Sequence, residues 1–219
     1  MERRLTAVPL GPFQSNMYVM TGDAGIFVVD PSVSPNRAGD YCGIRGLAEG
    51  ECNVRAILLT HGHYDHIKYV DKWMELYPDA EVFFSSNDKA LLGNGYANCS
   101  YMDGLQLTYG FSFTDVAGMN GNSIISEAGV EITVLETPGH TKGSVCYLSS
   151  SSGEDILFTG DTVFQGSVGR TDLPGGSSRV LADSVRRISR MAPELRIYPG
   201  HGPDSTIGDE LKYNPFFTL

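Results

Sequence analysis

The sequence predicts a mixed α/β protein, and three observations lead to that prediction. Short apolar segments rich in β-branched and aromatic residues recur along the chain and end in turn residues, which is typical of strands. Stretches in which apolar residues recur at helical spacing fall between some of these segments. The 219 residues are 41% hydrophobic, which is enough for one sizeable core. We therefore expect one compact domain spanning residues 1–219.

The expected strands, in chain order, are Gln14–Met20, Gly25–Val29, Val54–Leu59, Glu81–Phe84, Glu131–Leu135, Ser144–Leu148, Ile156–Phe158 and Leu195–Tyr198. The spacing of apolar residues predicts helices from about His66 to Leu76 and from Ser178 to Met191. The segment from Gly93 to Gly129 is rich in Gly, Asn and Ser. Loops of that length are more often functional or mobile than incidental, so we expect this one to cover a site.

Charge and composition exclude several classes of function. The chain has 16 basic and 26 acidic residues, a net charge of −10, which repels phosphate backbones and anionic membrane surfaces. No apolar stretch is long enough for a membrane span, and Pro and Gly interrupt the first twelve residues before a signal-peptide core could form. The four cysteines lie far apart without a C-x-x-C pair, which favours reduced structural thiols. We expect a soluble cytoplasmic protein with no nucleic-acid or membrane partner.

The placement of the five histidines points to metal chemistry. His61, His63 and His66 follow the predicted strand that ends at Leu59. In an extended segment, residues two apart point to the same side, so His61 and His63 can converge on one point. As the chain turns into a helix, Asp65 and His66 can present an oxygen and a nitrogen to a neighbouring point. We therefore expect two adjacent cation sites.

The remaining histidines repeat this placement at the ends of other predicted strands. His140 follows the strand ending at Leu135, His201 follows the strand ending at Tyr198, and Asp161 follows the strand ending at Phe158. Strand ends expose functional groups while a rigid scaffold holds them. Imidazole and carboxylate ligands without cysteine suit zinc, and also iron or manganese.

The order His61-x-His63-x-Asp65-His66, followed by His140, Asp161 and His201, resembles the signature of the metallo-β-lactamase fold superfamily. The resemblance spans almost the whole chain and implies a four-layer αββα sandwich of two mixed β-sheets flanked by helices. It also implies two divalent metal ions. The first would be held by His61, His63 and His140 and the second by Asp65, His66 and His201, with Asp161 as the bridging ligand.

Within this superfamily, residues 160–176 and 202–216 resemble the small glyoxalase II-like hydrolases, also called hydroxyacylglutathione hydrolase-like. This resemblance implies that Arg170 binds a carboxylate of the thiol carrier. Two positions later the family has an aromatic residue where this chain has Asp172. The sequence also ends without the helical domain that binds glutathione in full-length glyoxalase II, so we expect a shallow, permissive carrier site. Lys68-Tyr69 replaces two glycines found in many relatives, and we expect only a local change at the helix start.

The chemistry expected of such a site is hydrolysis of a small-molecule thioester. Two cations roughly 3.5–4 Å apart lower the pKa of a bridging water toward neutrality, which gives hydroxide without a side-chain base. The same cations stabilise the oxyanion and the leaving thiolate. Asp65 and Asp161 are the candidate catalytic carboxylates because they fix coordination and charge.

Other functions remain open at this point. A persulfide dioxygenase would use a single iron held by His61, His140 and Asp161, which is the arrangement of two histidines and one carboxylate found in non-haem iron enzymes. A β-lactamase is disfavoured because its best-known zinc classes have cysteine at the position of Asp161. A metallo-ribonuclease is disfavoured by the acidic charge. A noncatalytic metal-binding or interaction module would bind metal and turn over no thioester, lactone or persulfide.

Overall fold

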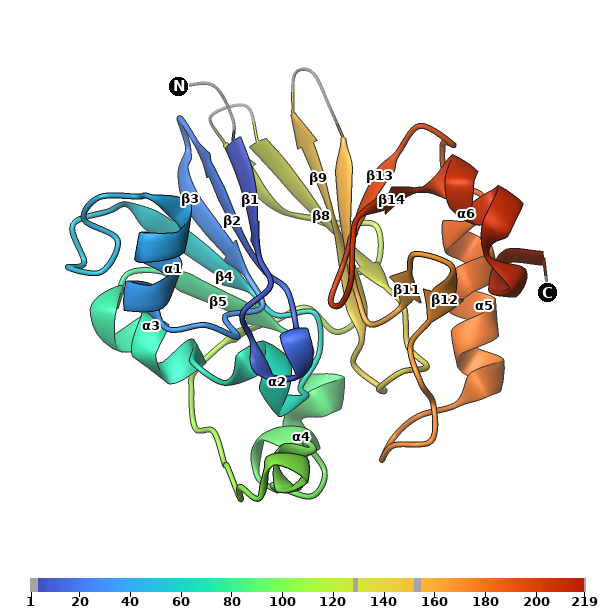
Figure 1. Ribbon diagram of the computed structural model, residues 1–219, viewed down its shortest axis with the longest axis horizontal. Helices are drawn as coiled ribbons and strands as arrows, with labels where there is room; N and C mark the ends of the chain where they lie inside the picture. Colours follow the sequence, from blue (N-terminus) through green and yellow to red (C-terminus); the bar gives the residue numbers. More distant parts are fainter. Residues whose placement is uncertain (1–3, 128–129, 152–154, 219) are drawn as a thin grey trace. The chain divides into compact units, whose positions relative to one another are not determined.

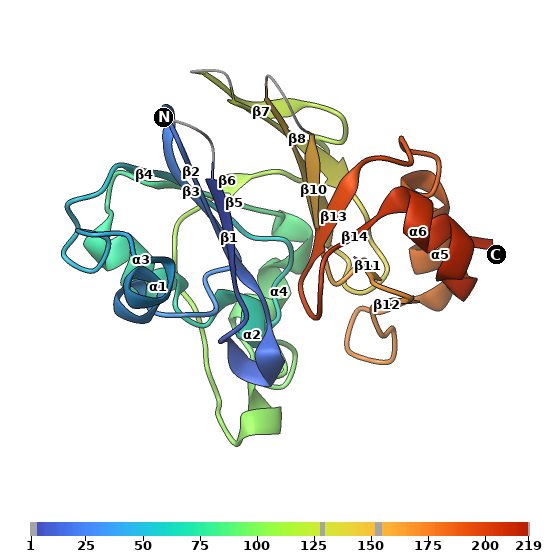
Figure 2. The same cartoon turned by 45° about the horizontal axis from the view of Figure 1, so that its top comes forward.

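The structure is a computed structural model that describes residues 4–127, 130–151 and 155–218. The chain divides into two compact units. The first comprises Met1–Phe84 and Lys89–Asp115, and the second comprises Ser85–Asp88 and Val116–Leu219. Within the described residues, each unit contains one six-stranded sheet, and Figures 1 and 2 show both sheets from two directions.

The sheet of the first unit has the strand order β1-β2-β3-β4-β5-β6. Its strands are β1 (Arg4–Val8), β2 (Met17–Gly22), β3 (Gly25–Val29), β4 (Val54–Leu58), β5 (Glu81–Phe84) and β6 (Thr114–Asp115). The first three pair antiparallel, and β3 to β6 pair parallel, so the sheet is mixed. The carboxyl ends of the parallel neighbours β3 and β4 therefore lie at the same edge of the sheet.

Helices cover one face of this sheet (Figure 1). The helical segments of the unit are η1 (Pro12–Gln14), α1 (Pro35–Cys42), α2 (Tyr64–Ile67), α3 (Val70–Leu76), α4 (Lys89–Leu92) and η3 (Ser100–Asp103). Ala38 of α1 and Trp73 of α3 share a buried apolar cluster with Val28 and Ile57 of the sheet. The indole nitrogen of Trp73 donates to the carbonyl of Val33 at 2.8 Å, so its one polar group is satisfied inside the core.

The sheet of the second unit has the order β14-β13-β10-β9-β8-β7. Its strands are β7 (Ser123–Glu127), β8 (Val130–Glu136), β9 (Val145–Ser151), β10 (Ile156–Gly160), β13 (Arg196–Pro199) and β14 (Ser205–Thr206). All neighbours pair antiparallel except β10 and β13, which pair parallel. It follows that β8, β10 and β13 run in the same direction and end at the same edge. This geometry places the three segments that follow these strands close together.

Helices also cover a face of the second sheet (Figure 1). The remaining elements are η2 (Ser86–Asp88), the paired short strands β11 (Val163–Phe164) and β12 (Ser167–Val168), α5 (Ser178–Ile188), α6 (Ile207–Tyr213) and η4 (Pro215–Thr218). Leu181 and Val185 of α5 pack with Leu157 and Ile197 of the sheet. The Ser177 side chain accepts a hydrogen bond from the Val180 amide and so caps the N-terminus of α5.

Most of the predicted strands are confirmed with shifts of a few residues at their ends. The predicted strand Gln14–Met20 begins only at Met17, because Phe13 and Gln14 adopt positive φ angles of 55° and 61° in the preceding turn. The structure also adds β1, α1, β7 and α6, which apolar periodicity did not predict. The segment 93–129 contains η3, β6 and β7 within its described residues, and its covering role stays a prediction.

The prediction of one helix from His66 to Leu76 is wrong. Two helices, α2 and α3, occupy this stretch, and the chain breaks between them at Lys68 and Tyr69. Tyr69 has φ −113° and ψ 14°, and its amide donates to the carbonyl of Pro31 at 3.0 Å rather than to the preceding helical turn. The second predicted helix is confirmed but ends at Ile188 rather than Met191.

Two further predictions concern the cysteines and membrane-spanning helices. In the described residues no disulfide joins any of the four cysteines, and Cys42, Cys99 and Cys146 are buried. In the described part of the chain, no helix is long and apolar enough to cross a membrane.

Candidate metal ligands in the two units

The first unit brings together four of the predicted ligands at the carboxyl end of β4. His61 and His63 lie in the segment after this strand, and Asp65 and His66 lie in α2. All four residues are at most 7% exposed. The ring centroids of His61 and His63 are 4.8 Å apart, and those of His61 and His66 are 4.2 Å apart. The four donors thus form one compact, buried group.

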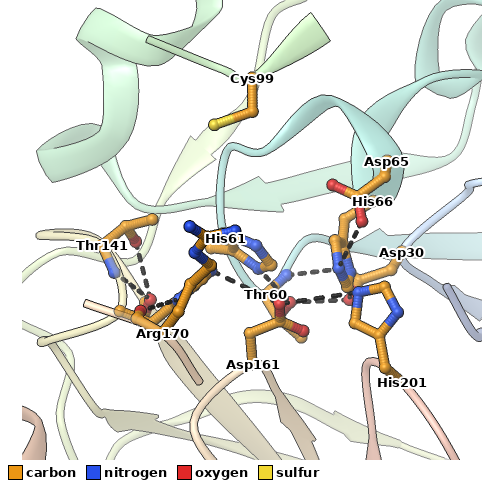
Figure 3. Close-up of polar contacts among 12 residues, drawn as sticks. Asp30, Thr60, His61, Asp65, His66, Cys99, Thr141, Asp161, Arg170 and His201 are labelled. Carbon is orange, nitrogen blue, oxygen red and sulfur yellow. Dashed lines mark hydrogen bonds and ion pairs between the residues drawn. The ribbon is translucent and has the colours of Figure 1, made fainter. Parts of the chain in front are cut away.

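Asp30, a residue that the sequence did not single out, orients this group. It follows β3 and is 2% exposed. Its carboxylate accepts hydrogen bonds from the Thr60 amide at 2.8 Å, the Thr60 hydroxyl at 2.7 Å and Nδ1 of His66 at 2.9 Å. Figure 3 shows Asp30 between Thr60 and His66. Because an ionised carboxylate only accepts, His66 carries its proton on Nδ1 and presents a lone pair at Nε2.

The hydrogen bonds of Thr60 determine in the same way which ring nitrogen of His61 carries the proton. Nδ1 of His61 lies 3.0 Å from the Thr60 hydroxyl oxygen. That hydroxyl has one proton, which it donates to Asp30, so it accepts from His61. Nε2 of His61 therefore also presents a lone pair, as a metal ligand requires.

The second unit brings together the other three predicted ligands at the common edge of β8, β10 and β13. His140, Asp161 and His201 each follow one of these strands. Oδ2 of Asp161 lies 3.5 Å from Nε2 of His140 and 3.7 Å from Nε2 of His201. Nδ1 of His140 donates to the carbonyl of Arg170 at 2.7 Å, so its Nε2 is unprotonated in the neutral ring.

The distances of 3.5 Å and 3.7 Å between the histidine nitrogens and the Asp161 oxygen are longer than ordinary hydrogen bonds and match the spacing of ligands around one metal ion. Nε2 of His66 is also 3.5 Å from Oδ2 of Asp65. In His66 and His140 the lone pair of Nε2 faces an oxygen lone pair, and such contacts repel unless a cation lies near both atoms. Two ligands about 2.1 Å from one tetrahedral ion lie about 3.4 Å apart. The ligand chemistry and spacing within each unit therefore fit a divalent metal.

A buried aspartate supports the segment that carries His140. Asp88 is 2% exposed and accepts from the Thr141 hydroxyl and from the Gly143 amide, each at 2.7 Å. The Thr141 hydroxyl is also 2.7 Å from the Ser144 hydroxyl. Asp88 and Thr141 are functional candidates that the sequence analysis did not identify, because only the fold brings η2 to this loop.

Arg170 is placed beside the second ligand group, but its side chain is already engaged. Its Nε and Nη2 donate to the two carboxylate oxygens of Asp172, each at 2.7 Å. The Arg170 guanidinium lowers the pKa of Asp172 to about 2. Arg170 also lines a cavity of about 310 Å³ together with apolar residues of β12, α5 and η4, namely Val168, Leu181, Ala182, Val185 and Phe216.

The family of the chain follows from comparison with known proteins. The family model for the metallo-beta-lactamase superfamily matches residues 10–201. The chain belongs to this superfamily. Its similarity to the solved structure of the BLEG-1 B3 metallo-beta-lactamase covers 99% of this chain and 100% of that chain, with a TM-score of 0.85 and 32% identity. The expected fold class, two mixed sheets with flanking helices, is thereby confirmed.

Other relatives are similar over nearly the whole length. The "Probable metallo-hydrolase YqgX" of Bacillus subtilis is 33% identical, and the match covers 95% of both chains. TTHA1623, solved in a di-iron-bound form, is 32% identical with a TM-score of 0.79, over 96% of this chain and 99% of that chain. The "Probable polyketide biosynthesis zinc-dependent hydrolase PksB" of Bacillus subtilis is 32% identical over 88% of this chain and 76% of that protein.

Proposed function

We propose that this chain is a metal-dependent hydrolase that cleaves small-molecule thioesters, in the manner of the glyoxalase II-like enzymes. The observation that carries the proposal is the hydrogen bonding of three histidine rings. Nδ1 of each ring, in His61, His66 and His140, lies against a hydroxyl, a carboxylate or a backbone carbonyl that accepts its proton. Each Nε2 is then available to a metal. Membership of the superfamily supports the metal-dependent reaction.

The proposal assigns the ligands as the resemblance implies. His61, His63 and His140 hold one ion, Asp65, His66 and His201 hold the other, and Asp161 serves both. Zinc is the proposed metal, with iron as the second choice, because relatives that match most of this chain are described as zinc-dependent and as di-iron-bound. The donor set of imidazole and carboxylate suits either metal.

The protein residues contribute orientation and charge to the reaction. Two bound divalent ions supply Lewis acidity, which acidifies water and polarises a carbonyl oxygen. Asp30 and the Arg170 carbonyl fix the rings of His66 and His140, so little reorganisation is needed during turnover. Asp65 and Asp161 contribute negative charge that offsets the charge of the ions.

A thioesterase assay on protein of known metal content tests this function. Protein purified without chelator is assayed for thioester hydrolysis and for oxygen uptake with a persulfide on the same sample. We expect thioester hydrolysis that Asp161→Ala reduces at least about a hundredfold, because one substitution affects the coordination of both ions. Asp183→Ala, an exposed change on α5, serves as the control and keeps the activity. Oxygen uptake without hydrolysis would contradict the proposal and favour the iron dioxygenase.

Hydrolysis of β-lactams is a second candidate function. The observation that favours it is the similarity to the BLEG-1 B3 metallo-beta-lactamase over the whole chain. A chromogenic cephalosporin in the same assay series separates the two reactions. A kcat/KM for the cephalosporin above that for every thioester would make β-lactam hydrolysis the better assignment.

A further inference from the structure

The pairing of Arg170 with Asp172 bears on which thiol carriers the second unit can accept. The guanidinium and the carboxylate form two parallel hydrogen bonds of 2.7 Å, the geometry in which arginine also binds a substrate carboxylate. Both side chains are largely exposed, at 56% and 66%. The Asp172 carboxylate therefore occupies two donors of the arginine that the family resemblance assigns to a carboxylate of the thiol carrier.

The backbone of this segment is fixed beside the ligands. The Arg170 carbonyl accepts from Nδ1 of His140. A Cβ on Gly169 would lie 1.9 Å from the Asp161 carbonyl oxygen and 3.1 Å from Nδ1 of His140, so the chain passes these residues at contact distance. The Arg170 side chain thus starts from a backbone that is held in contact with His140 and Asp161.

The cavity that Arg170 borders is lined mainly by apolar residues, together with Gly169, Thr171 and Ser178. Leu181 and Val185 of α5, with Val168 and Phe216, line the 310 Å³ cavity on which Arg170 borders. Arg170 at its edge is paired with Asp172, and the pair carries no net charge because the guanidinium is cationic and the Asp172 carboxylate, whose pKa the guanidinium lowers, is anionic. An uncharged, apolar group suits this cavity better than a carboxylate does.

We propose that Asp172 determines carrier specificity: by occupying the guanidinium of Arg170, it makes the site accept thioesters with short uncharged thiol arms and bind carboxylate-bearing arms weakly. This inference rests on the proposed thioesterase function. A carboxylate-bearing arm must displace Asp172 from the bidentate pair and then lie beside a second negative charge. Because Asp172 is tethered two residues away, its effective concentration at Arg170 is far above that of a free substrate.

The test compares carriers that differ only in charge. The ratio of kcat/KM values is measured for one acyl group on a short carboxylate-bearing thiol and on the matched thiol with a terminal hydroxyl. In Asp172→Ala we expect this ratio to rise about fivefold, the scale of an exposed ion pair, through a lower KM for the charged carrier and an unchanged kcat. The double variant Arg170→Ala/Asp172→Ala should lose the increase, because no guanidinium is left to bind the carboxylate.

Asp183→Ala provides a matched control. Asp183 is an exposed acid that pairs with Arg186 at 2.6 Å in the same unit, so its loss changes the net charge by the same amount. The ratio in this variant should equal that of the wild type. An unchanged ratio in Asp172→Ala, or an equal rise in Asp183→Ala, would overturn the proposal.

A binding measurement separates this inference from the thioesterase proposal. Isothermal titration of the same two free thiols into the metal-loaded protein reports the carboxylate preference without turnover. The expected result is again an increase of about fivefold in relative affinity for the charged thiol in Asp172→Ala alone. Absence of thioester hydrolysis with this binding result would contradict the proposed function and support the role of Asp172, whereas equal affinity ratios in both proteins would contradict that role.

Discussion

Asp30 connects the backbone geometry of the first unit to its metal chemistry. It adopts a positive φ of 50°, a conformation that Asp and Asn tolerate better than most residues. Its carboxylate then reaches both Thr60 and His66. The contacts fix the proton on Nδ1 of two histidines, directly for His66 and through the Thr60 hydroxyl for His61.

The substitution Asp30→Asn tests this role with almost no change in volume. We expect metal affinity to fall about 10- to 100-fold, because the amide keeps the αL conformation but cannot accept all three hydrogen bonds. A competition titration against a chromogenic chelator measures the affinity. Asp40→Asn, an exposed change on α1, is the control. Affinities within about twofold of each other for the two variants would show that Asp30 does not orient His66.

Gly169 offers a test in the second unit. Gly169→Ala places a methyl group 1.9 Å from the Asp161 carbonyl oxygen, closer than any atom can approach, so the segment carrying Asp161 or Arg170 must move. We expect lower metal content and a lower melting temperature, measured by elemental analysis and calorimetry. In Gly110→Ala the added methyl group meets no atom within 4 Å, and this variant should match the wild type. A fully metal-loaded, normally stable Gly169→Ala protein would contradict the close packing.

The predicted ligands were accessible from the sequence, whereas their supporting residues were not. Histidine is rare in this chain, and each histidine follows an apolar segment, so the pattern is selective. Asp30 also follows a strand, but aspartate is common at strand ends for reasons of turn formation. Only the parallel pairing of β3 with β4 places it beside Thr60. Asp172 was visible as a departure from the family, yet its contact with Arg170 is known only from the structure.

The three-residue helical turn η2 holds the loop that follows β8. Asp88 satisfies the Thr141 hydroxyl and the Gly143 amide inside the second unit. A Cβ on Gly143 would lie 2.7 Å from the Asp88 amide nitrogen, so the two segments are in direct backbone contact. The loop carrying His140 is therefore fixed by a residue more than fifty positions earlier in the chain.

Asp88→Ala should destabilise the protein by about 3 kcal/mol, because two buried donors lose a charged acceptor. Urea unfolding followed by circular dichroism measures the change in the free energy of unfolding. Asp209→Ala, which removes an exposed acid of α6, should change that free energy by less than about 1 kcal/mol. Equal effects of the two variants would mean that the Asp88 network does not hold the loop.

Helix boundaries show where sequence periodicity was insufficient. The spacing of Ile67, Val70, Trp73 and Met74 is helical throughout, and it predicted one continuous helix. The structure inserts a break because the Tyr69 amide bonds to Pro31 instead. That tertiary hydrogen bond leaves no local signature, so the number of helices could not be derived from the pattern, although the buried face was correct.

At the scale of the whole molecule, the seven candidate ligands are divided between two units with separate apolar clusters. The first unit carries four and the second carries three. The first group follows a single strand, β4, whereas the second lies at the carboxyl ends of β8, β10 and β13, which run in the same direction and so bring together residues far apart in sequence. The superfamily assignment supports a metal-dependent reaction, and the use of both groups in that reaction stays a prediction.

The number of metal ions bound per chain tests the proposed pair of metal ions directly. Elemental analysis and native mass spectrometry of protein purified without chelator, with adequate metal supply, give the number of ions per chain. We expect close to two for the wild type and for Asp183→Ala, and fewer than two for Asp161→Ala, because Asp161 is the proposed ligand of both ions. A wild-type chain that holds one ion under saturating metal, or an Asp161→Ala chain that still holds two, would contradict this proposal.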